Sequence, residues 1–293
     1  MTQSGDEVSV GPWAMEKLDA LGQYLNFYTT ALSKHHWLTT IFVDAFAGPG
    51  LSVVRSKAKG RTLPQMFGAE VGDEEVEYLK GSPRVALDIA RPFSSYVFID
   101  SDIDRVTELK LLSDEYAGRR DIRVHRGDSN SVLQDWLASG IDWSKNKAVV
   151  FLDPVGMQVS WAIIEALAKT KAIEVLINFP FDMAINRMLV KSGEFPPGWK
   201  FSLDTFFGST DWQKIAYEES EDLFGKRTSK SAESTALILA WYRGRLKEAF
   251  GYVSTARLVK NTRGNSLYHL IWAGPHPLGL KGAEHILGPR TKS

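Results

Sequence analysis

The stretch of sequence that decides the fold is Phe42-Val43-Asp44-Ala45-Phe46-Ala47-Gly48-Pro49-Gly50. The apolar run 40–45 is typical of a buried strand, and the glycines behind it allow a tight turn and close approach of a ligand to the backbone. A dinucleotide fingerprint would need a third glycine where Val53 stands, and a P-loop would need Gly-Lys followed by Ser or Thr. The turn therefore excludes a P-loop and makes a nicotinamide enzyme a poor fit.

Strand and helix patterns alternate outward from this turn. Apolar runs at 96–100, 122–125, 148–153 and 173–178 predict strands, separated by helices with apolar residues at three- and four-residue steps. Such runs indicate a parallel sheet buried on both faces, wound in the doubly wound α/β manner. The runs 252–259 and 267–273, joined by a short polar link, predict a terminal antiparallel hairpin. We therefore expect a Rossmann-like, seven-stranded α/β sheet.

The segments that break this alternation predict the domain organisation. We expect one domain over residues 1–293, with a helical extension at 1–38 and a loop insertion at 51–80, which is rich in glycine and charge. Residues 190–230 interrupt the alternation of strands and helices, and they are rich in glycine, proline and aromatic residues. They predict a cap-like, partly helical insertion.

Composition excludes several protein classes. The chain has 293 residues, 35 Lys and Arg, 35 Asp and Glu, 44% hydrophobic residues and no cysteine. These values exclude a mainly disordered chain, and the missing cysteine excludes disulfides, thiolate nucleophiles and iron–sulfur ligation by this chain. We find no apolar run long enough to span a membrane, no signal peptide and no metal-type histidine spacing, and we expect a cytoplasmic protein without a metal.

Four acidic residues end predicted strands or follow them directly: Asp44, Asp100, Asp128 and Asp153. Each alone is explained as a helix cap or a turn residue. Because ligands of open α/β sheets bind at the carboxyl ends of the strands, four acids on one rim together predict a ligand site there.

With these residues the chain resembles the class I S-adenosylmethionine-dependent methyltransferases, whose first strand ends in an acid and a glycine turn. It resembles more closely the three-Cys-motif partner proteins of bacteria and phages. The resemblance rests on the order of these motifs: Trp13…Lys17-Leu18…Tyr24-Leu25, Phe42 to Gly50, Gly81-Ser82-Pro83, Phe98-Ile99-Asp100, Phe151 to Gly156, Ile177-Asn178-Phe179-Pro180 and Tyr268-His269-Leu270.

The resemblance implies a site for S-adenosylmethionine. Asp44 and the backbone of Gly48 and Gly50 would face the cationic methionine part, Asp100 the ribose hydroxyls, and Asp128 the adenine amino group. The implied cofactor residues are Asp44, Phe46, Gly48, Gly50, Asp100, Asp128 and Ser129.

The methyl acceptor would lie near Asp153, which could remove its proton, with Pro154, Asn178 and Phe179 as further substrate residues. The sequence Asp153-Pro154-Val155-Gly156 lacks the second proline and the aromatic residue of nucleic-acid amino-methyltransferases. The acceptor itself is not identified by the sequence.

Two other functions stay open. The chain could bind the cofactor or act as a scaffold for a three-cysteine-motif partner that resembles radical S-adenosylmethionine enzymes. It could also be a nucleic-acid-modifying defence enzyme, which would use the basic run 55–61 and the Lys and Arg residues of the C-terminal part. The zero net charge argues against a protein that coats nucleic acid without selectivity.

Overall fold

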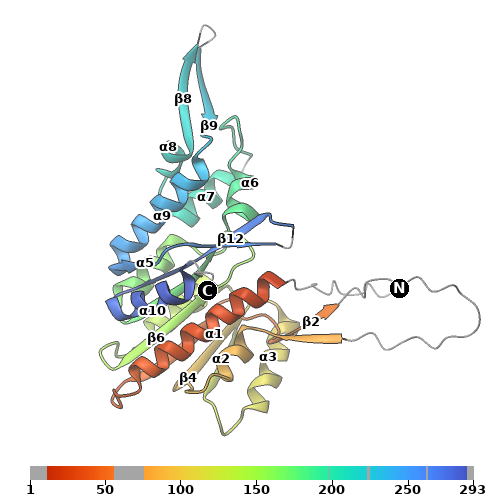
Figure 1. The fold of residues 1–293 in the computed structure, drawn as a ribbon, viewed down its shortest axis with the longest axis vertical. Coiled ribbons are helices and arrows are strands. Elements are labelled where there is room, and N and C mark those ends of the chain that lie inside the picture. The colour runs from red at the N-terminus through yellow and green to blue at the C-terminus, as the bar shows by residue number, and fades with distance from the viewer. Residues whose placement is uncertain (1–11, 56–75, 197, 223–224, 262, 289–293) are drawn as a thin grey trace, which may run out of the picture.

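The computed structural model describes residues 12–55 and 76–288, except 197, 223–224 and 262, around a mostly parallel sheet (Figure 1). The strands follow the order β10-β12-β7-β6-β1-β4-β5, and β11 pairs with β12 outside this path. β12 runs antiparallel to β7, β10 and β11, while the remaining neighbours are parallel. The predicted α/β fold with an antiparallel end is confirmed. The strand bounds are β1 Thr39–Asp44, β4 Ser95–Asp100, β5 Ile122–Arg126, β6 Asn146–Leu152, β7 Ile173–Phe179, β10 Tyr252–Val253, β11 Arg257–Lys260 and β12 Ser266–Gly274.

The order of the strands places the point where the topology reverses at β1. The chain moves outward from β1 to β4 and β5, then returns to the other side of β1 for β6 and β7. Crevices at such a switch point, outside the carboxyl ends of the strands, are where open α/β sheets bind ligands.

Helices cover both faces of the sheet because the strands are apolar on both faces. Alternate side chains point to opposite sides: Val43 and Val150 belong to one core cluster, Phe42 and Phe151 to the other. No helix within the described residues is both long and apolar enough to span a bilayer. The helices are α1 Pro12–Leu32, α2 Ser82–Leu87, α3 Ile103–Glu115, α4 Ser129–Ala138, α5 Trp161–Lys169, α6 Asn186–Met188, α7 Trp199–Phe207, α8 Trp212–Ala216, α9 Ser234–Phe250 and α10 Pro277–Leu287, with a π-helical turn, η1, at Phe181–Ile185.

Helix α1 lies across one face of the sheet (Figure 1). Its buried stripe includes Leu21, Tyr24 and Tyr28. The Tyr24 hydroxyl donates a 2.5 Å hydrogen bond to Oε2 of Glu174, a buried acid near the start of strand β7. Burial raises the pKa of Glu174 to about 7, although the Tyr24 hydroxyl and the nearby Trp272 indole oppose the shift. The helix is thus joined to the sheet by a buried polar contact as well as by apolar packing.

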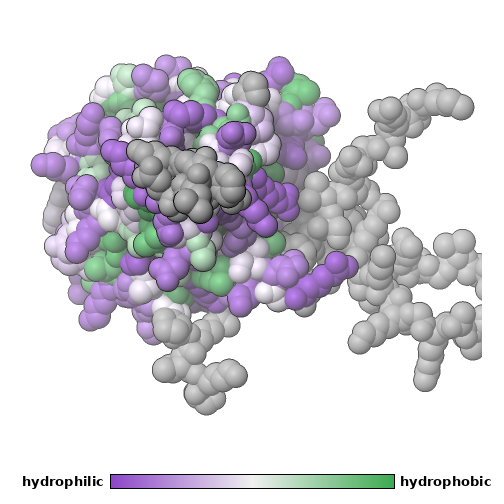
Figure 2. Space-filling view, turned by 90° about the horizontal axis from the view of Figure 1, so that it is seen from above, coloured by the Kyte–Doolittle hydropathy of each residue, from purple (hydrophilic) through white to green (hydrophobic). Residues whose placement is uncertain are grey.

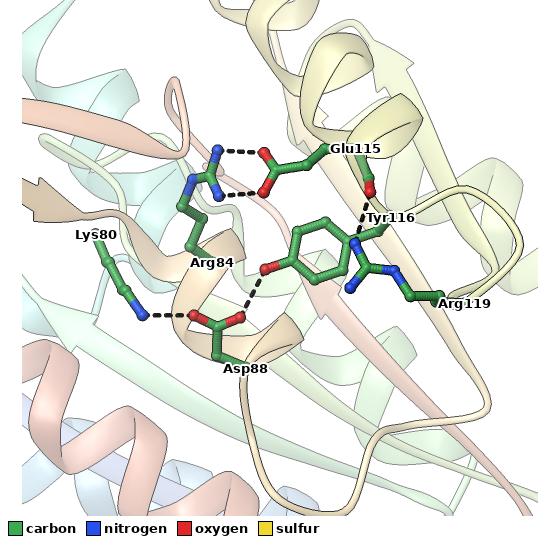
Figure 3. Close-up of polar contacts among 6 residues, drawn as sticks. All are labelled: Lys80, Arg84, Asp88, Glu115, Tyr116 and Arg119. Carbon is green, nitrogen blue, oxygen red and sulfur yellow. Dashed lines mark hydrogen bonds and ion pairs between the residues drawn. The ribbon is translucent and has the colours of Figure 1, made fainter.

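A surface network fixes α2 against α3 (Figure 3). Arg84 makes a bidentate ion pair with Glu115, at 2.9 and 2.6 Å, and the Tyr116 hydroxyl donates to Asp88 at 2.6 Å. Lys80, at the end of β3, pairs with the other oxygen of Asp88. The network therefore holds the middle and the end of α2 against the end of α3.

The insertion between β7 and α9 packs through aromatic rings. Phe206 stacks on Tyr242 at 5.7 Å between ring centroids, and Trp212 is fully buried. Helices α7 and α8 give the region its expected helical part, and an antiparallel ribbon, β8 Tyr217–Asp222 with β9 Gly225–Lys230, projects beyond them (Figure 1). Seen from that end, hydrophilic side chains cover most of the surface, and hydrophobic ones form small separate patches (Figure 2).

The structure differs from the sequence predictions in two places. The expected strand 252–259 is divided into β10 and β11, because Ser254 bonds to both the amide and the carbonyl of Trp272 and its own carbonyl accepts from Arg243. The expected loop 51–80 begins and ends in paired strands, β2 Leu51–Arg55 and β3 Val76–Lys80. Most of the basic run 55–61 and the last residues of the chain lie outside the described residues.

We expect Tyr24→Phe to lower the free energy of unfolding by about 1–3 kcal/mol, because the variant leaves a buried carboxyl oxygen without its donor. Urea unfolding measures the loss. Tyr252→Phe is the control, since this tyrosine is only half-buried, and its effect should stay within about 0.5 kcal/mol. Equal effects of the two variants would show that the Tyr24–Glu174 contact contributes nothing.

Candidate functional site

The four acids predicted from the sequence lie along one edge of the sheet. Asp44 is the last residue of β1 and Asp100 the last of β4. Asp153 directly follows β6, and Asp128 comes shortly after β5. Because these four strands are parallel, their carboxyl ends meet at the same edge, on either side of the switch point at β1.

Asp44 is the most buried of the four acids, with no exposed surface. Its Oδ1 accepts a 3.2 Å hydrogen bond from the Phe46 amide, while Oδ2 is buried and accepts no hydrogen bond from the described residues. Burial raises the pKa of Asp44 to about 7, and the charge of Asp153 adds to the shift. The shift is opposed by the Phe46 amide, by the charge of Lys17 and by the Ser82 hydroxyl, which lies near the carboxyl group without an aligned hydrogen bond to Oδ2. This carboxyl therefore needs a donor or a cation to be stable as an anion.

Asp100 holds the glycine turn in place. Its Oδ2 accepts from the Gly48 amide at 3.0 Å, and its Oδ1 accepts from the Asp102 amide at 2.9 Å. Gly48 and Gly50 have φ values of +63° and +75°, which other residues rarely adopt. A Cβ added at Gly48 would meet no atom within 4 Å, so the space beside its backbone is open. The turn thus offers an open approach to the main chain next to two carboxyl groups.

The start of α4 holds the next two predicted residues. Asp128 is exposed and is the N-cap of the helix, because its Oδ1 accepts from the Ser131 amide at 3.0 Å. Ser129 is buried and donates its hydroxyl to the carbonyl of Ala45. Ser129 therefore joins α4 to the strand end beside Asp44. Phe46 is half-buried against the core on the α4 side.

Asp153 has two partners that the sequence analysis did not assign. Lys17, from α1, forms an ion pair with its Oδ2, and the Asn178 amide donates to its Oδ1 at 2.6 Å. The Oδ1 of Asn178 is itself buried and accepts no hydrogen bond from the described residues. Both oxygens of the predicted proton acceptor are thus already engaged, and an unsatisfied acceptor atom lies next to them.

Lys17 could have been found from the sequence, because it is a cation on the buried stripe of a helix. It lies on the same face of α1 as Leu21, Tyr24 and Tyr28, at helical spacing. In the structure its ammonium also lies 5.6 Å from the centre of the Tyr268 ring, on β12. Lys17 therefore connects α1 to the ends of β6 and β12 at the rim.

Phe179 and Pro154 are both buried. Phe179 faces away from Asn178, and its ring stacks on Tyr242 of α9 at 4.6 Å between centroids. The structure thus brings Asp44, Asp153 and Asn178 close to Lys17 of α1. Phe179 belongs instead to the hydrophobic core on the face of the sheet away from α1. Within the described part of the chain no cluster of three His, Asp or Glu side chains could hold a metal ion.

The edge as a whole can bind a cationic or hydrogen-donating ligand. It offers a buried carboxyl group with one oxygen unsatisfied, a second carboxylate on the turn, and an open backbone at Gly48. Lys17 neutralises Asp153 on the β6 side, and Arg105 lies 3.8 Å from Oδ2 of Asp100 on the β4 side, whereas Asp44 at the end of β1 has no ion pair with a described residue.

No protein-family model matches the sequence, and no curated protein matches it either. Among solved structures, protein LPL1258 from Legionella pneumophila str. Philadelphia 1, of family model DUF519, aligns with 93% of this chain and 93% of its own at 13% identity and a TM-score of 0.46. The bifunctional kinase-methyltransferase WbdD aligns with 89% of this chain and 39% of its own at 11% identity and a TM-score of 0.39. A candidate S-adenosylmethionine-dependent methyltransferase from Listeria monocytogenes aligns with 88% of this chain and 98% of its own at 11% identity and a TM-score of 0.35.

The raised pKa of Asp44 predicts a pH dependence of stability. A carboxyl group whose pKa rises from 3.8 to about 7 on folding stabilises the protein fully below about pH 4 and loses this contribution as pH rises through 7. The shift corresponds to about 4 kcal/mol, and Glu174 acts in the same direction. We expect Asp44→Asn to flatten the fall in unfolding free energy between these pH values, measured by urea unfolding. The exposed Asp121→Asn should keep the wild-type slope, and a wild-type slope in Asp44→Asn would contradict the prediction.

Proposed function

We propose that the protein binds S-adenosylmethionine at the edge around the Gly48-Pro49-Gly50 turn and transfers its methyl group to an acceptor near Asp153. The observation that carries the proposal is the fully buried Asp44, whose Oδ2 has no partner among the described residues. The methionine part of this cofactor carries an ammonium and a sulfonium group, and both favour an ionised carboxylate as neighbour.

The other cofactor roles follow from the same edge. Each oxygen of Asp100 accepts one backbone hydrogen bond, and Arg105 lies 3.8 Å from Oδ2. Because this ion pair is longer than a hydrogen bond, each oxygen keeps capacity for another donor, and the carboxylate could also take the two ribose hydroxyls. Gly48 presents its open backbone to the ligand. Asp128 would lie toward the adenine end, although its capping bond to α4 already uses one oxygen.

Near Asp153, the role proposed for the residues is to bind the methyl acceptor and to orient it. The bound cofactor supplies an electrophilic methyl group, and the task left to the protein is to hold an acceptor lone pair in line with it. The buried Oδ1 of Asn178 would accept an N–H or O–H of the acceptor, next to Asp153 and Lys17. Asp153 would take the proton of the acceptor on the remaining lone pair of one of its oxygens, beside the contacts from Lys17 and Asn178.

The resemblance to the three-Cys-motif partner proteins adds a second role, in which the chain works with a three-cysteine-motif protein. The order of motifs along the cysteine-free chain supports it. Copurification from a coexpression of both proteins tests this role, and the absence of a complex would speak against it.

We expect calorimetry to show micromolar binding of S-adenosylmethionine and S-adenosylhomocysteine, and Gly48→Ala to abolish it. The added methyl group would strain a backbone at φ +63° and narrow the approach to it. Gly140→Ala is the matched control, because Gly140 has a φ of +80° and equally open surroundings far from the edge. The proposal fails if neither ligand binds, or if the two variants bind alike.

Binding should also depend on pH through Asp44. A cationic ligand favours the ionised carboxylate, so a pKa of about 7 predicts that affinity rises about tenfold between pH 6 and 8. Calorimetric titrations across this range measure the change. Asp44→Asn should bind more weakly and without this dependence, whereas an unchanged profile in the variant would assign the cation to another group.

A further inference from the structure

A cavity of about 260 Å³ lies at the edge of the sheet opposite the one that carries Asp44, Asp153 and the Gly48-Pro49-Gly50 turn, which we call the cofactor edge. It is bounded by the second half of α1, the starts of β6 and β7, and the first turn of α10. Phe27, Tyr28 and Leu32 of α1 and Leu278 of α10 form most of its apolar wall. A cavity of about 150 Å³ is enough to bind benzene, so this one has room for a ring with a short chain.

Glu174 is the one acid among the residues that line this cavity. Its Oε2 accepts the Tyr24 hydroxyl, and its Oε1 faces Gly279, where an added Cβ would stand only 2.6 Å from it. A second glycine, Gly274, leaves space beside the same side chain. At both glycines the Trp272 ring is the nearest group, so they make room for this ring and the Glu174 side chain together in the wall of the cavity.

The basic residues around the cavity do not neutralise this carboxyl group. Lys147 donates to the carbonyl of Trp143 at 3.2 Å, and Nδ1 of His276 accepts from the Leu278 amide at 3.2 Å. Neither these two residues nor His35 and Lys171, which also line the cavity, form an ion pair with Glu174. Within the described residues, Glu174 therefore has no ion-pair partner.

We propose that this cavity is a second ligand site, which takes a small organic amine with an aromatic or alkyl body. The body would pack against Phe27 and Tyr28, and the ammonium group would pair with Glu174. The site is independent of the proposed cofactor edge, because its residues come from the amino ends of β6 and β7, whereas Asp153 and Asn178 lie at their carboxyl ends.

Three isosteric probes test the charge that the site selects: phenylpropylamine, phenylpropanol and phenylpropionate, titrated into the full chain by calorimetry. We expect the amine to bind at least about tenfold more tightly than the alcohol, and the acid not to bind. Binding of the amine should strengthen as pH rises through about 7, since burial holds the pKa of Glu174 there. The other titratable groups at the cavity are Tyr24, Tyr28, His35, Lys147, Lys171 and His276.

Two variants locate the binding. Glu174→Gln keeps the shape of the side chain and should remove the preference for the amine. Ala31→Trp fills the cavity from α1 without touching Glu174 or its hydrogen bond, and should abolish binding of the amine even if Glu174→Gln does not fold. Glu248→Gln, at another cavity, is the matched control and should bind as the wild type does.

The remaining outcomes each overturn the proposal. Preference for the acid would show that Lys147 and Lys171 select an anion, and equal binding of all three probes would show a merely apolar cavity. No binding, or binding that Ala31→Trp leaves intact, would exclude this site. Amine binding that is lost in Asp44→Asn but kept in Ala31→Trp would place the amine at the cofactor edge.

Discussion

The docking of helix α1 on the sheet is the contact on which both edges of the molecule depend. Lys17, near the start of the helix, pairs with Asp153 at the carboxyl edge. Tyr24, two turns later, donates to the buried Glu174 further down the same face. The helix therefore supplies a cation to Asp153, which the sheet provides only with the Asn178 amide, and a hydroxyl donor to the buried Glu174. Burying such groups without partners is costly.

The position of Lys17 also makes the acids of the candidate site different from one another. With Lys17 on the β6 side, the acid there is neutralised, while Asp44 on β1 keeps an unsatisfied oxygen and a raised pKa. A binding site for a cation is thereby confined to the region between the glycine turn and β1. The acceptor side keeps a hydrogen-bonded set, Asp153, Asn178 and Lys17, whose geometry is already fixed before a ligand binds.

Buried acids recur at both edges, and both have pKa values raised by burial to about 7. Such groups lower the stability of the protein near neutral pH, and perturbed carboxyl groups gather at functional sites more often than elsewhere. Asp44 is followed by a glycine turn with an open backbone at Gly48, and Gly274 and Gly279 leave room for the Glu174 side chain and the Trp272 ring.

The sequence by itself determined the α/β fold, the rim of acids and the antiparallel end, because these follow from local periodicity and from the rule that parallel strands end at one edge. Only the tertiary structure decided which acids have partners. Lys17 and Asp153 are 136 positions apart, Tyr24 and Glu174 are 150 apart, and no local pattern specifies such pairings. The division of strand 252–259 was likewise decided by Ser254, whose hydrogen bonds to Trp272 depend on packing against β12. Burial and charge pairing are properties of the assembled layers, and they set the chemistry of each carboxyl group.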